Sequence, residues 1–344
     1  MPAEKKPAEK KPAAKPVLGV GLDIGTMNIV SARRKGKEVV TRRMRDCFLD
    51  FEADAKKMLQ LANTNFVERD EEIIVVGDAA MKMANVLGRE VRRPLQAGLV
   101  SAGELDALEV LGIIIKNVLG EPAEEDEVCC FSIPAAPIDD LSRDVIYHQG
   151  VFDRIVSECG YDAIASNEAM AIIYSEAAKE NFSGLSISFG SGMCNVALAV
   201  NTIEGLTFSL ARGGDWIDAG AAKAMNQTPA RMCALKESGI DLMNPKTREE
   251  EALSFYYKNL IEYALKHIRQ EFKKIEGQFA LPEPIPLIIS GGTSLAGGFS
   301  EFFTQVFEKK RKRFPIPISE VRHASDPLNS VAKGLLVQAM QEYS

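Results

Sequence analysis

The residues of this chain best suited to bind a ligand lie in short turns that contain glycine. Asp23–Thr26 follows an apolar run, as does Ser188–Met193, and Gly291–Thr293 follows a third. Glycine lets backbone N–H groups approach an anion closely, and short hydroxyl and amide side chains add further donors. We therefore expect these turns to bind the phosphates of a nucleotide. The candidate residues are Asp23, Gly25, Thr26, Met27, Asn28, Gly190, Ser191, Gly192, Met193, Gly291, Gly292 and Thr293.

Asp23 is the candidate metal ligand of the first turn. A carboxylate is a poor neighbour for phosphate, but it can hold a Mg²⁺ ion that keeps several of its waters. A second interpretation stays open, in which Asp23 and Gly25 only form the turn of a hairpin. The sequence has neither a Gly-x-x-x-x-Gly-Lys-Ser/Thr loop nor a Gly-x-Gly-x-x-Gly turn after its first strand. A Walker loop and a nicotinamide-binding turn are therefore not expected.

The elements that would position these turns occur twice along the chain. Apolar patterns predict strands over residues 18–23, 28–33 and 38–43, and again over 185–190, 194–200 and 206–210. Further patterns predict a buried strand over 128–133, a long helix over 138–159 that starts after Pro137, and helices over 168–179 and 249–276. The repeat, at a spacing of about 165 residues, predicts an α/β protein with two related lobes and a ligand between them.

Composition shifts divide the chain further. Residues 1–16 carry five lysines, two glutamates and no large apolar side chain after Met1, which predicts a disordered tail. We expect a first lobe over residues 17–165 plus 323–344, with an insertion of helices and one strand over about 35–93. The second lobe is expected over 166–322, with a helical insertion over about 216–284.

Bulk properties exclude several classes of protein. The net charge is −7, which disfavours a general nucleic-acid binder. No apolar run approaches the length of a membrane span or of a secretory signal, so we expect no direct membrane insertion. The six cysteines lack metal-ligand spacing and indicate reduced thiols, which together with the missing signal predicts a cytoplasmic protein.

Five motifs together resemble one superfamily. Asp23–Thr26 and Ser188–Val196 are similar to the two phosphate loops of the actin, heat-shock chaperone and sugar kinase superfamily of nucleotide-binding proteins. Asn167–Ala171 resembles its connecting helix, while Arg212–Asp215 and Ile289–Thr293 resemble its later phosphate and adenosine motifs. The length, without an appended domain, is most similar to bacterial actins of the MreB and MamK type. The resemblance covers most of the chain and implies an actin-like fold, two lobes of mixed sheets flanked by helices around a central nucleotide cleft.

The resemblance also implies roles for individual residues. Glu168 would orient the attacking water, unless it only caps its helix. Gly213, Gly214 and Asp215 would join the cofactor-binding set. The cofactors would be ATP or ADP with Mg²⁺. Ser188 stands where the family has an Asp, which removes a charge from the metal site, and Ala230 and Cys233 stand where bacterial actins place an acidic residue and a lysine for the nucleoside.

Three functions follow from the resemblance. The first is a filament protein that polymerises head to tail with ATP and Mg²⁺, hydrolyses ATP slowly, and acts as an intracellular scaffold with a protein cargo or adaptor. The second is a non-polymerising, ATP-dependent chaperone or reactivase of the same superfamily. The third is a small-molecule kinase, for which the sequence shows no set of residues that would bind and activate an acceptor.

Overall fold

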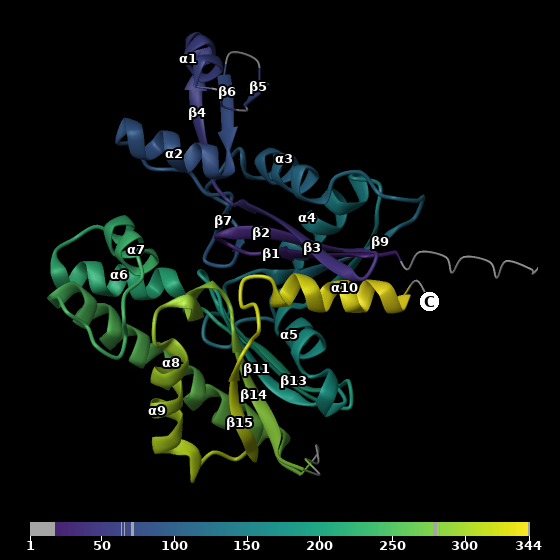
Figure 1. Ribbon diagram of the computed structural model, residues 1–344, viewed down its shortest axis with the longest axis vertical. Coiled ribbons are helices and arrows are strands. Elements are labelled where there is room, and N and C mark those ends of the chain that lie inside the picture. Colours follow the sequence, from purple (N-terminus) through teal and green to yellow (C-terminus); the bar gives the residue numbers. More distant parts are fainter. Residues whose placement is uncertain are drawn as a thin grey trace, which may run out of the picture.

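Two mixed β-sheets form the centre of the molecule (Figure 1). The computed structural model describes residues 18–62, 64, 66–69, 72–277, 281 and 283–342, so the tail expected over residues 1–16 lies outside the described residues. The first sheet comprises, in spatial order, β10 (Asp162–Asn167), β9 (Val128–Ile133), β1 (Val20–Ile24), β2 (Asn28–Lys35) and β3 (Glu38–Arg45). The second comprises β13 (Ile203–Leu210), β12 (Cys194–Val200), β11 (Gly184–Phe189), β14 (Ile285–Ser290) and β15 (Ile318–His323).

The two sheets have the same topology. In the first, β1, β2 and β3 are antiparallel neighbours, and β1 also pairs in parallel with β9, which pairs in parallel with β10. In the second, β11, β12 and β13 form the antiparallel part, while β14 and β15 follow β11 in parallel. The predicted repeat of a strand, a glycine turn and a second strand is therefore confirmed.

Helices separate and cover the sheets. One hydrophobic core lies between the first sheet and helices α3 and α4, another between the second sheet and α6, α8 and α9, and a third contains α5 and α10 between the sheets. Figure 1 shows α10 crossing the middle of the molecule. Strand β9 illustrates the pattern, because Phe131 faces the α3 and α4 core while Cys130 faces α5 and α10. The helices are α3 (Ala107–Leu119), α4 (Val145–Glu158), α5 (Glu168–Glu176), α6 (Gly214–Met225), α8 (Arg248–Ile275), α9 (Phe299–Arg311) and α10 (Ser330–Glu342).

The central helices α5 and α10 pack against each other unusually closely. A Cβ atom on Gly334 of α10 would collide with the carbonyl group of Ala171 in α5. Only glycine permits this approach, so Gly334 allows the two central helices to pack closely.

Two smaller units extend from the sheets. The first contains β4 (Phe48–Glu52), η1 (Ala53–Ala55), α1 (Lys56–Leu61), β5 (Val67–Arg69), β6 (Glu72–Val76) and α2 (Gly77–Leu87). It has a three-stranded sheet of order β4-β6-β5, whereas the sequence predicted one strand there. Short strands that alternate charged and apolar residues, such as Glu52 beside Phe51, are weak signals by themselves. The second unit contains α6 and α7 (Pro229–Glu237) with the first part of α8.

The helix predicted over 138–159 is shorter in the structure. Helix α4 starts at Val145, because Asp144 caps it by accepting hydrogen bonds from the amides of Ile146 and Tyr147. Ile138 instead donates its amide proton to the carbonyl oxygen of Ser209 in the second sheet at 3.0 Å. This bond diverts the chain after Pro137. Among the described residues, no helix has the length and apolar character required to cross a membrane.

The remaining regular elements are short. The hairpin of β7 (Leu95–Gln96) and β8 (Leu99–Val100) reaches from the first half of the chain toward the second sheet. Its tip residue Gly98 lies against Met193, which follows β11. Two 3-10 turns complete the set, η2 (Ala178–Glu180) after α5 and η3 (Gly292–Leu295) after β14.

Candidate functional site

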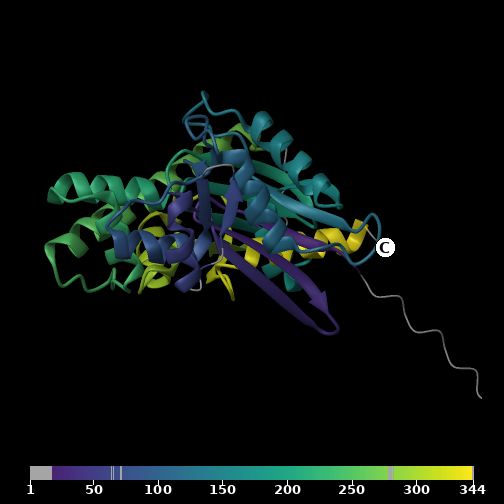
Figure 2. The same cartoon turned by 90° about the horizontal axis from the view of Figure 1, so that it is seen from above.

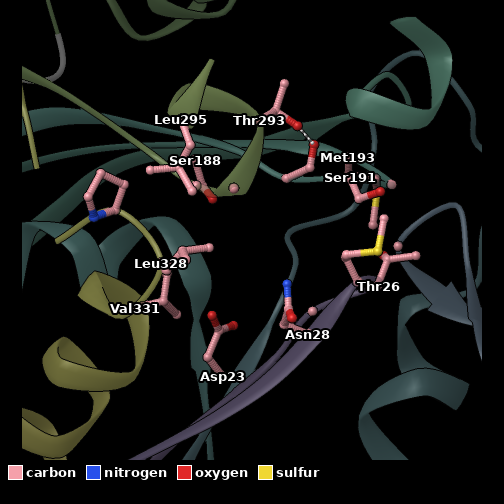
Figure 3. A pocket seen from close by; sticks show the side chains of 18 of the residues that line it. Asp23, Thr26, Asn28, Ser188, Ser191, Met193, Thr293, Leu295, Leu328 and Val331 are labelled. Atoms are coloured by element: carbon pink, nitrogen blue, oxygen red, sulfur yellow. Dashed lines mark hydrogen bonds between the residues drawn. The ribbon is translucent and has the colours of Figure 1, made fainter. Parts of the chain in front are cut away.

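A cleft of about 400 Å³ lies where the two sheets meet. Figure 3 shows Asp23 and Asn28 facing Ser188 and Thr293 across its open space. All the predicted turns contribute to it. Of the predicted site residues, those that line the cleft are Asp23, Gly25, Thr26, Met27, Asn28, Glu168, Gly190, Ser191, Gly192, Met193, Gly291, Gly292 and Thr293.

The first turn joins β1 to β2 and is held from both sides. The amide of Gly25 donates to the carbonyl oxygen of Asn28 at 3.1 Å, which closes the turn. Ser132, at the end of β9, accepts from the amide of Ile24 at 2.7 Å and donates its hydroxyl proton to Asp23 Oδ1 at 3.1 Å. The Asp23 carboxylate is therefore held at the end of β1, where it lines the cleft.

Asp23 and Glu168 form the electrostatic centre of the cleft. Burial and the neighbouring carboxylate of Glu168 raise the pKa of Asp23 well above its usual range, and the bond from Ser132 offsets part of this. Burial also raises the pKa of Glu168. Two buried carboxyl groups that disfavour each other's charge favour the binding of a cation or of a shared proton between them.

The side chain of Glu168 is fully engaged by the second sheet. Ser188 on β11 donates to Glu168 Oε1 at 2.5 Å, and the amide group of Asn195 on β12 donates to Oε2 at 2.8 Å. Ser188 and Asn195 are direct cross-strand partners, so both reach the same carboxylate. Asn167, and not Glu168, caps α5 by accepting from the amides of Ala169 and Met170. Glu168 is therefore free of a capping role and lies in the cleft.

The second turn follows β11 and is supported from behind. Gly214 donates its amide proton to the carbonyl oxygen of Gly190 at 2.9 Å, and the Ser191 hydroxyl donates to Asp215 Oδ1 at 2.7 Å. A Cβ atom on Gly213 would collide with the carbonyl groups of the same turn. Gly213, Gly214 and Asp215 therefore do not line the cleft but hold the second turn in place.

The first and second turns touch each other. A Cβ atom on Gly192 would collide with the backbone of Gly98 and would lie 2.7 Å from Thr26 Oγ1. Thr293 completes the set, because its hydroxyl donates to the carbonyl oxygen of Gly190 at 2.9 Å. The three glycine turns thus form one continuous wall, and backbone N–H groups in such turns are good anion donors.

Charged residues that the sequence interpretation missed lie around the mouth of the cleft. Arg45 of β3 pairs with Glu237 of α7 at 3.2 Å and with Asp78 of α2 at 3.4 Å, so one guanidinium joins both halves of the molecule. Arg43 and Lys236 also line the cleft. In the sequence, only the charge of these residues could have suggested a role at the cleft. No local pattern shows that β3 lies opposite the distant helix α7.

Helix α7 also lines the cleft. Ala230 and Cys233 are the positions at which the resemblance implies an acidic residue and a lysine, and Cys233 itself lies on the cleft. The structure has Lys236 and Glu237 on the cleft, further along the same helix α7. Lys236 is also paired with the buried carboxylate of Asp218 at 2.7 Å. Both kinds of side chain are therefore present.

Two sheets of equal topology with a cleft between their first turns form an actin-like fold. The predicted fold class is confirmed. The family model named Volactin matches residues 18–339, and the chain belongs to the Volactin family.

Solved structures support the same fold assignment. The chain is similar to the MamK double helical filament, with 18% identity and a TM-score of 0.71 over 94% of this chain and 98% of that one. It is also similar to MreB5 of Spiroplasma citri bound to AMPPNP, with 15% identity and a TM-score of 0.65 over 93% of this chain and 95% of that one. The ethanolamine utilization protein EutJ from Carboxydothermus hydrogenoformans has 16% identity and a TM-score of 0.56 over 96% of this chain and 92% of that one. A search of curated proteins finds no significant match.

Proposed function

We propose that the protein binds ATP or ADP with Mg²⁺ in the cleft and polymerises head to tail into filaments. The observation that carries the proposal is the convergence of three glycine turns, from both sheets, on the carboxylates of Asp23 and Glu168. The turns offer backbone donors to the phosphates. The nucleotide would contact Asp23, Gly25, Thr26, Met27, Asn28, Gly190, Ser191, Gly192, Met193, Gly291, Gly292 and Thr293, with Gly213, Gly214 and Asp215 as its support.

The residues present fit a magnesium ion. Asp23 has one carboxylate oxygen bound by Ser132, and burial beside Glu168 disfavours its charge, so a dication would relieve the repulsion. Among the described residues, no group of three or more His, Cys, Asp or Glu side chains could hold a metal ion. A hydrated Mg²⁺ shared with phosphate oxygens matches such a sparse donor set. Asp23 would hold it, and the ion would neutralise phosphate charge.

The nucleoside would lie toward the other end of the cleft. Leu295, Leu328 and Val331 line that side and supply apolar surface for a base (Figure 3). Lys236 and Glu237 supply a donor and an acceptor for the sugar or base edge. These contacts support a purine nucleotide.

We further propose that hydrolysis is slow and depends on Glu168. Both oxygens of its carboxylate accept hydrogen bonds, from Ser188 and from Asn195, so binding a water requires sharing or releasing one of them. Ser188 is neutral, so Asp23 and Glu168 are the acidic side chains that line this part of the cleft. Phosphoryl transfer depends mainly on alignment of the reacting groups and on charge stabilisation. Glu168 would align the attacking water, but the neutral Ser188 would add no negative charge to hold the magnesium ion.

Filament formation is supported by the likeness to the MamK filament and needs a contact between unlike surfaces, which repeats without closing. The two sheets with their covering helices would act as the lobes, residues 17–165 with 323–344 and residues 166–322. All six cysteines are free, which supports a reducing compartment such as the cytoplasm. The filament would act there as a scaffold or positioning system for a protein cargo or adaptor.

A pelleting assay with negative-stain microscopy tests the proposal. Purified chain is compared without nucleotide, with ADP, with ATP and with AMPPNP, each with Mg²⁺ and with EDTA. Filaments that need ATP or AMPPNP and Mg²⁺ are the expected result. A chain that binds ATP and stays unpolymerised in all conditions would refute the filament and favour the chaperone or reactivase alternative. A chain that binds no nucleotide would refute the cleft assignment itself.

A further inference from the structure

The hairpin of β2 and β3 carries a concentration of positive charge that the cleft does not use. Four of its basic side chains are exposed, make no ion pair within the described part of the chain and do not line the cleft: Arg34, Lys35, Lys37 and Arg42. Glu38 is its one exposed acidic residue, whereas the whole chain has a net charge of −7. Figure 2 shows the hairpin, in purple, extending beyond the body of the molecule. We call residues Arg34–Arg42 the basic edge.

The same segment presents an unpaired strand. β3 is the last strand of its sheet, so the backbone groups on its outer side have no partner strand among the described residues. Val39 and Val40 are 46% and 44% exposed, which is high for apolar residues of a strand. The other end of β3 is covered, because Gly77 of α2 lies against Met44. The open part of the edge therefore coincides with the cationic part.

Sequence outside the described residues adds to this charge. Residues 1–16 contain five lysines and two glutamates. The described chain begins at Leu18, and Val20 pairs directly with Arg33 on β2. The described chain thus begins at the end of the sheet where the β2–β3 hairpin turns.

We propose that the basic edge docks an acidic protein segment in extended conformation, which adds to the first sheet as a further strand beside β3. The backbone of that segment would pair with the open edge, and its carboxylates would lie near Lys35, Lys37 and Arg42. Successive residues of β3 face opposite sides of the sheet, so the apolar side chains of the added strand would cover Val39 on one face while its carboxylates lie beside Val40 and Arg42 on the other.

The combination of features selects this partner over other anions. A nucleic acid or a lipid surface would use the charges but leave the unpaired backbone and both valines unmatched. A second β3 edge would match the backbone but oppose like charges, which disfavours pairing between copies. An acidic extended peptide that alternates charged and apolar residues uses the positive charge, the unpaired backbone and the exposed surface of Val39 together. Two copies of the basic edge therefore repel each other, whereas a strand of opposite charge can pair with it.

Binding of defined peptides to the full-length chain tests the proposal. The probe is a short fluorescent peptide that alternates glutamate and valine, measured by anisotropy. Its two controls are a lysine–valine peptide and a glutamate–proline peptide of equal charge, since proline cannot complete a strand ladder. We expect binding of the glutamate–valine peptide alone, and slower hydrogen exchange of backbone amides in Val39–Arg42 when it binds.

A charge-reversed variant with a matched control separates the basic edge from overall charge. Lys35→Glu with Arg42→Glu should weaken binding of the peptide about tenfold or more, because Arg42 would lie directly beside the added strand and Lys35, on the neighbouring β2, contributes to the same positive surface. Lys309→Glu with Lys312→Glu makes the same change of charge at the end of α9, on exposed residues without an ion pair among those described, and should leave binding within about twofold. Arg43 is kept unchanged in both variants because it lines the cleft.

Several results would overturn the proposal. Equal loss in both variants would show that only net charge matters, and equal affinity for the glutamate–proline peptide would exclude strand addition. Tighter binding of duplex DNA or of anionic vesicles, lost in the Lys35 and Arg42 variant, would assign the basic edge to a different partner. Nucleotide binding, measured in parallel, should be the same in both variants, so failure here is distinct from failure of the cleft assignment.

Discussion

Replacing Ser188 by aspartate should add a negative charge to the side of the cleft that β11 forms. We expect this charge to destabilise the ligand-free chain and bound Mg²⁺ to remove the destabilisation. The Ser188 hydroxyl lies 2.5 Å from Glu168 Oε1 and is buried, with 1% of the residue exposed. An aspartate there would exchange a donor for a second acceptor and place a third carboxylate beside Glu168 and Asp23. Those two groups already resist ionisation through burial.

The size of the effect follows from Coulomb's law. Two like charges about 4 Å apart repel by about 4 kcal/mol at an effective dielectric constant of about 20. Protonation of one carboxyl group relieves part of this, so we expect the ligand-free Ser188→Asp variant to lose on the order of 2–4 kcal/mol of unfolding free energy. At roughly 1.5 °C per kcal/mol for a chain of more than 300 residues, the melting temperature should fall by about 3–6 °C.

Thermal unfolding of three proteins separates the effect of the added charge on stability from the effect of the changed side-chain shape. The parent, Ser188→Asp and Ser188→Asn are compared at neutral pH with EDTA and with Mg²⁺ and AMPPNP. Asparagine has the shape of aspartate without its charge. We expect Ser188→Asp to unfold well below Ser188→Asn with EDTA, and the gap to close or reverse with Mg²⁺ and AMPPNP. Phosphate release from Mg²⁺ and ATP should also be faster in Ser188→Asp than in the parent.

Two outcomes would refute this reasoning. If Ser188→Asp and Ser188→Asn unfold at the same temperature in EDTA, the carboxylates do not interact as the structure indicates. If Ser188→Asp binds nucleotide and Mg²⁺ but gains neither stability nor turnover, the missing charge is not what limits hydrolysis.

Three further predictions concern the same cleft. Glu168→Gln should bind AMPPNP normally and release phosphate from ATP about 10²–10⁴-fold more slowly, and equal turnover would remove Glu168 from the catalytic role. The pKa values of Asp23 and Glu168 are raised in the folded chain, so above the ordinary carboxyl range the folded state binds more protons than the unfolded state. The unfolding free energy of the ligand-free chain should therefore fall as pH rises from about 5 to 8. Denaturant titrations that show no such fall would contradict the burial argument. Arg45→Ala and Glu237→Ala each break the ion pair across the mouth and should speed release of a fluorescent ATP analogue about two- to fivefold in stopped flow, whereas Arg43→Ala, which breaks no ion pair among the described residues, should change it less.

Local sequence was sufficient for the parts of the site that depend on backbone conformation. A buried strand followed by glycine and short polar residues is a local feature, and the turns at Gly25, Gly190 and Gly291 all line the cleft. The strand repeat was also predictable, because each antiparallel pair joins neighbours in sequence. The start of α4 was not, since it depends on the bond between Ile138 and Ser209 of the other sheet.

The sequence by itself determined the α/β class, the repeated strand, turn and strand unit, and most glycines of the cleft, because these follow from hydrophobic periodicity and from the conformational freedom of single residues. Only the tertiary structure decided what the side chains meet. It placed Ser188 and Asn195 on the two oxygens of Glu168, moved Gly213–Asp215 behind the second turn, and brought Arg45 to Glu237 across the mouth. Such contacts join residues far apart in the chain, and their distances depend on how two sheets and two central helices pack, which no local pattern encodes.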